Sequence, residues 1–413
     1  MKKFFVLLSC MFLMHGISAQ SLLDIYKKGA VKLTPDAEYA QGNNWEKVFE
    51  TYYDSLFINI PNIRGYWIGD RKSIVIMPDG SVVVNHANRN FYSLFDAKGK
   101  FVKEFGITNS SGKRLQKAQA ICGVMNNNFY TLPDNMGKAI FANFNGNHVK
   151  TLNFDHSVHD MIPLNNNKIA IVGWVIWSDR FRDFVAIVDY QTNEQKIIWD
   201  YFTILNTRID DSSEGVIFES ARINTRPSIA FTNNQLIVAL PHSGEILFYD
   251  VNGALKSKQK LDWQRKYLSV EEQKENMRKS MEGQSLRKKE LQESGETQSE
   301  KIRRIDVFLQ LMKESMEKIT EPRPLPMFAN VIKDSEGNLL FFEVPEKEGA
   351  NQFNVWVYND GKFVAKSSFV NEDFDLSITP TKMVFHNGYI YALQTLKNTQ
   401  GNPLRLVRFK VGN

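Results

Sequence analysis

Histidines are scarce in this sequence, and some of its seven are placed where they could act together. His159 and Asp160 are adjacent, while His86 and His242 each follow an apolar run closely. Imidazole and carboxylate groups that converge in a fold can bind a divalent metal, which would polarise a bound water or a substrate oxygen. These four are therefore candidates for metal-dependent chemistry. No complete metal-ligand motif joins them, so no metal or other cofactor is firmly implied, and ordinary loop histidines are the alternative.

A second group of candidates combines aromatic and basic side chains. Flat aromatic faces bind sugar rings or peptide side chains, and guanidinium groups bind carboxylates through paired hydrogen bonds. A glycan, an acidic sugar or a peptide would suit this mixture. The alternative is an ion-paired, partly buried loop, because Asp179 and Asp183 flank the arginines. The residues are Trp174, Trp177, Arg180, Phe181 and Arg182 in one stretch, Arg222 and Arg226 in another, and Arg89 close to His86.

Familiar catalytic motifs are absent, and the charge balance argues against one class of partner. The sequence has no Gly-x-Ser-x-Gly elbow, no His-Glu-x-x-His pair and no calcium-binding loop. Residues 106–113 resemble a phosphate-binding loop, but Arg114 stands where that motif requires Ser or Thr. With 51 Lys and Arg against 46 Asp and Glu, the net charge of +5 is too small to indicate binding to nucleic acid.

The first nineteen residues are predicted to be a signal peptide. Two lysines precede an apolar stretch at 4–14 that is too short to span a bilayer, and Ala19 is the small residue expected at a cleavage site. A lipoprotein anchor at Cys10 is the alternative. Cleavage after Ala19 would leave Cys122 as the only cysteine, so no internal disulfide is expected. No later apolar run is long enough for a transmembrane segment.

A repeat organises the rest of the sequence. Six segments contain short apolar runs separated by tight turns of Asn, Asp or Gly, which is the pattern of a four-stranded antiparallel meander. The third and fifth units are longer, which predicts insertions between their second and third strands. The two turns of a unit are 19 residues apart in three cases: Gly80 to Gly99, Asn127 to Gly146 and Asn234 to Gly253.

The sixth unit has only three apolar runs before the sequence ends. A strand from the N-terminal segment 20–62, such as 56–60, could complete it and close a ring, which removes exposed sheet edges. We therefore predict an all-β fold, a six-bladed β-propeller of four-stranded antiparallel blades, over residues 63–413. A sandwich or two stacked sheets is the alternative for six meanders.

The first unit resembles the repeat of NHL and TolB-like six-bladed propellers. The resemblance rests on Met77-Pro78-Asp79-Gly80-Ser81, on Phe95-Asp96-Ala97-Lys98-Gly99 and on the related run Phe248-Tyr249-Asp250-Val251-Asn252-Gly253 in the fourth unit. It implies a protein secreted to the periplasm or cell surface of a Gram-negative bacterium. Such propellers include binding scaffolds, lactonases, lyases and assembly proteins, so the resemblance specifies the fold and leaves the function open.

The long loops of such a propeller are expected at one end, which we call the insertion face. Two loops connect blades, at 203–226 and 262–326, and two enlarged loops lie within blades three and five, at 174–183 and 344–351. Binding sites are often built on elaborated loops that a rigid scaffold positions. The insertion face is therefore the predicted site.

The 262–326 insertion is predicted to be a helical hairpin between blades four and five. Ser269 with Glu272 and Thr297 with Glu300 each match a capping box, and helices are expected over 270–292 and 298–319. Thirteen basic and thirteen acidic residues between 262 and 322 leave the hairpin without net charge. It is either a decoration packed on the blades, or a lid or partner-docking hairpin.

These observations predict a secreted propeller that binds a glycan, peptide or other envelope component on its insertion face. A metal-dependent lyase or hydrolase acting at the propeller channel is one alternative. A scaffold or assembly protein that docks through the helical hairpin is another. The candidate ligand-binding residues are His86, Arg89, His159, Asp160, Trp177, Arg180, Arg222, Arg226 and His242.

Overall fold

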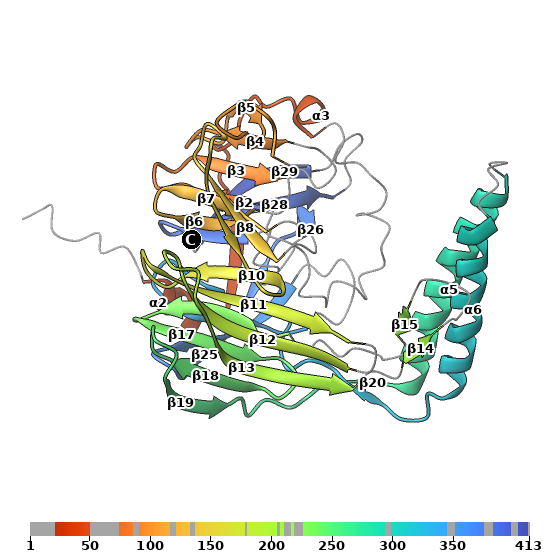
Figure 1. The fold of residues 1–413 in the computed structure, drawn as a ribbon. Coiled ribbons are helices and arrows are strands. Elements are labelled where there is room, and N and C mark those ends of the chain that lie inside the picture. Colours follow the sequence, from red (N-terminus) through yellow and green to blue (C-terminus); the bar gives the residue numbers. More distant parts are fainter. Residues whose placement is uncertain are drawn as a thin grey trace, which may run out of the picture.

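The computed structural model describes residues 21–49, 74–85, 91–115, 121–132, 137–177, 180–204, 207–209, 216–218, 226–293, 299–344, 352–375, 383–397 and 404–411. Four-stranded antiparallel sheets repeat along these residues, and together they form the predicted six-bladed β-propeller (Figure 1). Neighbouring blades are in contact through their first strands: β2 contacts β6, β6 contacts β10, β10 contacts β16, and β16 contacts β22. Blade one contains β2 (Ile74–Ile76), β3 (Val82–Asn85), β4 (Tyr92–Phe95) and β5 (Phe101–Phe105), and blade two contains β6 (Ile121–Met125), β7 (Asn128–Thr131), β8 (Lys138–Ala142) and β9 (His148–Asn153). Blade three contains β10 (Ser157–Pro163), β11 (Lys168–Ile176), β12 (Arg180–Asp189) and β13 (Gln195–Ile204), and blade four contains β16 (Ser228–Thr232), β17 (Gln235–Leu240), β18 (Glu245–Tyr249) and β19 (Leu255–Lys260). Blade five contains β22 (Asn330–Lys333), β23 (Leu339–Phe342), β24 (Gln352–Asn359) and β25 (Lys362–Val370).

Blade six is completed by the N-terminal strand β1 (Ala30–Pro35), which follows the short helix α2 (Leu22–Lys27). Its own strands are β27 (Met383–His386), β28 (Tyr389–Leu396) and β29 (Leu404–Val411), and β26 (Phe374–Asp375) also pairs with β28. The second half of β1 pairs antiparallel with β29, whereas its first half pairs parallel with β25 of blade five. Strand β1, from the N-terminal segment, therefore completes blade six. Residues 56–60, given as an example of such a strand, lie outside the described residues.

The tight turns occur where the sequence places them. Gly80, Gly99, Gly146 and Gly253 all have positive φ, between 77° and 85°. The asparagine turns at 126–127 and 233–234 adopt the left-handed conformation as well, which Asn tolerates better than most residues. The turn at Asn165 differs, because its side chain accepts hydrogen bonds from two following backbone N–H groups without a positive φ.

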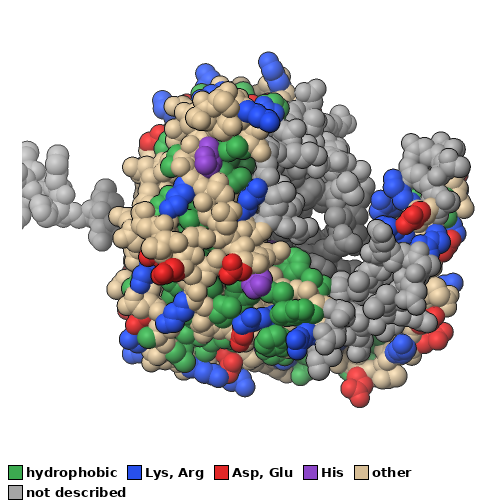
Figure 2. All heavy atoms as spheres, in the orientation of Figure 1, with side chains coloured by type: hydrophobic (Ala, Val, Ile, Leu, Met, Phe, Trp, Pro, Cys, Tyr) green, Lys and Arg blue, Asp and Glu red, His purple; other side chains and the backbone are tan. Residues whose placement is uncertain are grey.

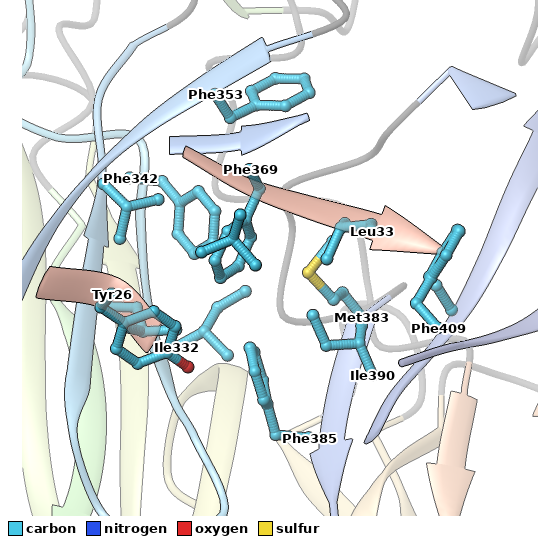
Figure 3. Packing of buried hydrophobic residues seen from close by; sticks show 14 of the residues in the cluster. Tyr26, Leu33, Ile332, Phe342, Phe353, Phe369, Met383, Phe385, Ile390 and Phe409 are labelled. Carbon is cyan, nitrogen blue, oxygen red and sulfur yellow. The ribbon is translucent and has the colours of Figure 1, made fainter. Parts of the chain in front are cut away.

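Apolar side chains between adjacent blades form the core. Figure 3 shows the packing around β1, where Leu33 lies among side chains of blades five and six. Some of the aromatic pairs here pack edge to face, such as Phe342 with Phe369, and others are tilted, such as Tyr26 with Phe369. Leu33, Phe342 and Phe369 are all almost completely buried, so β1 is an integral part of the core.

Polar contacts fasten the same N-terminal segment. The Arg408 guanidinium donates two hydrogen bonds to one oxygen of Asp36, at 2.6 and 3.0 Å, and lies over the rings of Tyr39 and Tyr389. The Tyr26 hydroxyl donates to the buried carboxylate of Asp334 at 3.1 Å. Burial raises the pKa of Asp334, and hydrogen bonds from Asn338 and Tyr26 oppose that rise.

The insertion between blades four and five is a helical hairpin, as predicted. It contains α5 (Val270–Glu293) and α6 (Ser299–Glu317), and the paired strands β20 (Tyr267–Leu268) and β21 (Arg323–Pro324) form its base. The helices pack mainly on each other, and Lys288 of α5 forms an ion pair with Asp306 of α6. Figure 1 shows them standing beside the propeller, so the hairpin is an arm and not a layer packed on blades four and five.

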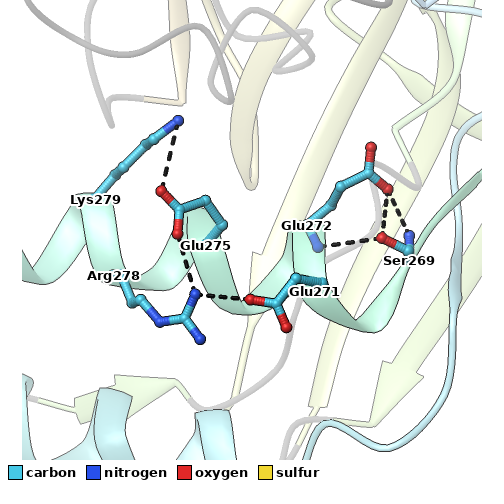
Figure 4. A network of polar contacts seen from close by, with 6 residues as sticks. All are labelled: Ser269, Glu271, Glu272, Glu275, Arg278 and Lys279. Carbon is cyan, nitrogen blue, oxygen red and sulfur yellow. Dashed lines mark hydrogen bonds and ion pairs between the residues drawn. The ribbon is translucent and has the colours of Figure 1, made fainter.

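The capping box at the start of α5 is confirmed (Figure 4). The Ser269 hydroxyl oxygen accepts from the Glu272 N–H at 3.2 Å, and the Glu272 carboxylate accepts from the Ser269 N–H at 2.8 Å. The partner box at Thr297 and Glu300 includes residues outside the described part of the chain. Along α5, Arg278 pairs with Glu271 and Glu275.

Replacing Ser269 with Ala should loosen the first turn of α5 and leave the propeller intact. Losing an N-cap hydroxyl costs about 1 kcal/mol, which corresponds to an increase of about fivefold in local opening. Amide hydrogen exchange in α5 measures this directly. Ser285→Ala is the matched control, since an exposed serine within the helix makes no cap and alanine favours helix there. Equal exchange in both variants would contradict the cap.

Candidate functional site

Blade three is built differently from its neighbours. The stretch 174–183, expected to be an enlarged loop, is mostly strand, because β11 continues to Ile176 and β12 begins at Arg180. The Trp177 N–H donates to the Arg180 carbonyl at 2.8 Å across the end of this hairpin. The stretch is rich in β-branched and aromatic residues, which favour extended backbone over an irregular loop. The additional residues of the third unit thus lengthen its strands toward the insertion face.

One side of this extension carries a cluster of aromatic and basic side chains, which we call the platform. It consists of Trp177, Arg180, Arg182 and Phe202. The Trp177 and Phe202 rings are stacked, with centroids 6.2 Å apart and 37% and 49% of the two residues exposed. The Arg180 guanidinium lies 5.1 Å from the Trp177 ring centroid, and that of Arg182 lies 5.4 Å from the Phe202 centroid. In Figure 2, hydrophobic and basic side chains gather over the ends of β12 and β13.

The platform is partly ion-paired, though not as the sequence indicated. Asp200, and not Asp183, is the partner of Arg182, whose two donors lie 2.6 and 3.0 Å from one carboxylate oxygen. Asp183 points to the other side of the sheet, because side chains alternate along β12. The predicted ion-paired loop is therefore an ion-paired strand with an exposed aromatic surface.

The opposite side of blade three holds a more buried polar cluster beside blade four. Arg226, two residues before β16, lies with Nη1 3.2 Å from Nδ1 of His159 and Nε 3.9 Å from a carboxylate oxygen of Asp183. His159 lies within β10, not before it, at a β-bulge that re-aims its side chain. Burial lowers the pKa of Arg226, and the Asp183 carboxylate partly offsets this. The neighbouring Asp160 accepts a hydrogen bond from the Met161 N–H.

His242 of blade four also contacts blade three. Its ring lies 4.6 Å from that of Tyr201 on β13, and its backbone carbonyl accepts a hydrogen bond from Arg265 at the base of the helical arm. Burial lowers the pKa of His242, and Glu245 acts in the opposite direction. Among the described residues, its Nδ1 atom and the Ser228 hydroxyl are buried and have no hydrogen-bond partner, so each can bond to a ligand or a water molecule.

The remaining candidates cannot be placed with these. His86, Arg89 and Arg222 lie outside the described residues. In the part of the chain that is described, no group of three or more His, Cys, Asp or Glu side chains could hold a metal ion. His159 contacts Arg226, and His242 contacts Tyr201. No helix among the described residues is both long and apolar enough to cross a membrane.

The sequence matches no protein-family model, and no curated protein is significantly similar to it. Solved structures do resemble it. A member of the DUF4221 family from Bacteroides vulgatus aligns with 84% of this chain and 94% of its own at 10% identity, with a TM-score of 0.46. Virginiamycin B lyase from Staphylococcus aureus aligns with 83% of this chain and 95% of its own, at 10% identity and a TM-score of 0.38. A protein of unknown function from Bacteroides caccae aligns with 80% of this chain and 93% of its own, at 10% identity and a TM-score of 0.35. These likenesses do not bear on which residues bind or react.

Sequence reasoning missed three contributors to this site: Asp200, Tyr201 and Phe202. They belong to β13, the last strand of blade three, which pairs antiparallel with β12. The turn near Asn193 sets that register and brings Phe202 opposite Arg182, with one bulge on the way. The spacing of this hairpin in the sequence therefore carried the information that β13 lies beside Arg182.

Proposed function

We propose that this protein is a secreted binding protein that recognises a carboxylate-bearing ligand through the platform of blade three. The observation that carries the proposal is the stacked pair Trp177 and Phe202, exposed together with the two arginines. Large aromatic and arginine side chains contribute most of the energy at binding surfaces. A soluble protein that leaves such a cluster exposed commonly uses it for binding.

The chemistry of the platform defines the ligand. The ring faces and edges offer contact area for a sugar ring or an apolar side chain. Guanidinium groups held against aromatic rings remain charged and bind carboxylates strongly. Both an acidic oligosaccharide and an acidic peptide combine these features, and each is compatible with a periplasmic or cell-surface location. The polar cluster of Arg226, His159 and Asp183 lies on the other side of the same blade and supports it from within.

We expect Trp177→Ala to weaken ligand binding by tenfold or more. Truncation of an aromatic residue at the centre of an interface commonly costs about 2 kcal/mol. Tryptophan fluorescence and calorimetry against soluble acidic oligosaccharides, their neutral analogues and acidic peptides would measure the loss and identify the source. Phe363→Ala is the control, because Phe363 is a comparably exposed aromatic residue on blade five. An equal effect of both variants, or binding that ignores the carboxylate, would refute the proposal.

A further inference from the structure

The outer strand of blade three has an open edge. Among the described residues, β12 is the one strand that pairs with β13, so the backbone groups on the other edge of β13 face away from the sheet. The Ile198 carbonyl accepts a hydrogen bond from the Tyr249 hydroxyl of blade four, so the open stretch of this edge is residues 199–204. The strand is ten residues long, twice the length of β5 in blade one. A long open edge is a template for pairing with another polypeptide.

The outer strands of other blades carry features that discourage such pairing. Strand β19 has lysines at 256, 258 and 260, and β9 has Lys150. Strand β5 is short and contains Lys103 and Glu104. Lysine on an edge strand is a common means of preventing unwanted association, because strand pairing would desolvate its charge.

Strand β13 lacks this protection over most of its length. Eight consecutive residues, 197–204, contain a single charged residue, Asp200, and the ion pair with Arg182 partly neutralises it. Ile197, Tyr201 and Phe202 are 41%, 39% and 49% exposed. These side chains alternate between the two sides of the sheet, so a strand added here would find apolar contacts on both.

We propose that the open edge of β13 binds an extended segment of a partner protein by strand addition, so that the platform ligand is an acidic peptide. The inference rests on the proposed function, since Phe202 belongs both to β13 and to the platform. The charges favour an acidic segment: Arg180 and Arg182 supply two positive charges beside the edge, where Asp200 supplies one negative charge. Backbone hydrogen bonds would give affinity, and alternate side chains would give selectivity.

The probe is a fluorescein-labelled synthetic peptide of alternating valine and threonine with a glutamate at each end. In strand addition, every second amide of the peptide bonds to β13 and the others point away. Two further peptides carry N-methyl groups on one alternate set of amides or on the other. Fluorescence anisotropy with the purified protein should show that one methylated peptide loses at least tenfold in affinity, while the other binds as the parent does.

Several outcomes would overturn strand addition. Equal effects of the two methylated peptides would mean that the backbone is not read. A dimer in sedimentation velocity that the peptide does not dissociate would mean that a second copy of the chain occupies the edge. Binding of an acidic oligosaccharide that Trp177→Ala abolishes, with no binding of the parent peptide, would refute the inference and leave the proposed function standing. Peptide binding that Trp177→Ala leaves unchanged would instead refute the platform.

Discussion

Arg408→Met is expected to destabilise the protein by about 3 kcal/mol, the cost of removing one partner of a largely buried ion pair. Its partner Asp36 is only 6% exposed at the side chain, and methionine would leave that carboxylate without its two strongest donors. The stacking of the guanidinium between Tyr39 and Tyr389 would be lost as well. Urea denaturation followed by fluorescence measures the change in the free energy of unfolding.

Arg182→Met is the matched control. Arg182 makes the same two-donor contact with Asp200, but that carboxylate is 39% exposed and water can replace the arginine. An exposed pair of this kind contributes less than about 1 kcal/mol. Similar losses in the two variants would mean that closure at β1 depends little on the Arg408 contact.

The pair of Asp36 and Arg408 should also make the free energy of unfolding depend on pH in the acidic range. Burial alone would raise the pKa of Asp36, but hydrogen bonds from Arg408 and the Glu38 N–H lower it below its ordinary value of 3.8. A carboxyl group with a lowered folded-state pKa stabilises the fold above its unfolded-state pKa, and that contribution is lost as the pH falls through the folded-state value. Arg408→Met should therefore flatten the decline of stability below about pH 4.

Gly146→Ala is expected to cost about 3 kcal/mol, from two sources that add. Gly146 has a φ of +85°, which is unfavourable for alanine, and a β-carbon there would lie 2.3 Å from the backbone carbonyl oxygen of Gly106. That oxygen belongs to the neighbouring blade-one segment, so relieving the contact requires movement of backbone between two blades. Denaturant unfolding and the yield of soluble protein would both report the effect.

Gly112→Ala separates the two sources. Gly112 also has a positive φ, +75°, but nothing lies within 4 Å of the position that a β-carbon would take. Its cost should be the backbone strain alone, about 1 kcal/mol. If the two variants unfold at the same denaturant concentration, the close approach of Gly106 to Gly146 has no energetic weight.

Much of the fold could be predicted because its signals are local. A tight turn such as 143–147, in which the Gly146 N–H donates to the Asn143 carbonyl and Gly146 has positive φ, fixes the register of its hairpin. The repeat of such turns fixes the blade. Apolar residues at both ends of 101–105 and of 404–411 mark the bounds of β5 and β29. The caps of the helical arm are equally local, because the Ser269 side chain bonds only three residues away.

Long-range pairing was not predictable in the same way. In the sequence, β1 is a short apolar run interrupted by a lysine, which is a weak signal for a strand. Its pairing with β25 and β29 identifies it as one. The candidate site likewise has a part that was predictable from the sequence and a part that was not. Trp177 and Arg180 could be chosen from their types, whereas the contact of Arg226 with His159 spans 67 residues and depends on how blades three and four meet. Sequence spacing carries no information about such a contact.

The position of β1 has a consequence for the order of folding. It pairs with β29, and the contact between Asp36 and Arg408 spans 372 residues, so the ring cannot close until nearly the whole chain is available. Contacts so distant in sequence make folding slow. Until then the edges of β25 and β29 are both open, and a chain emerging from its N-terminus would carry β1 as an unpaired strand. These unpaired edges are where premature association would begin.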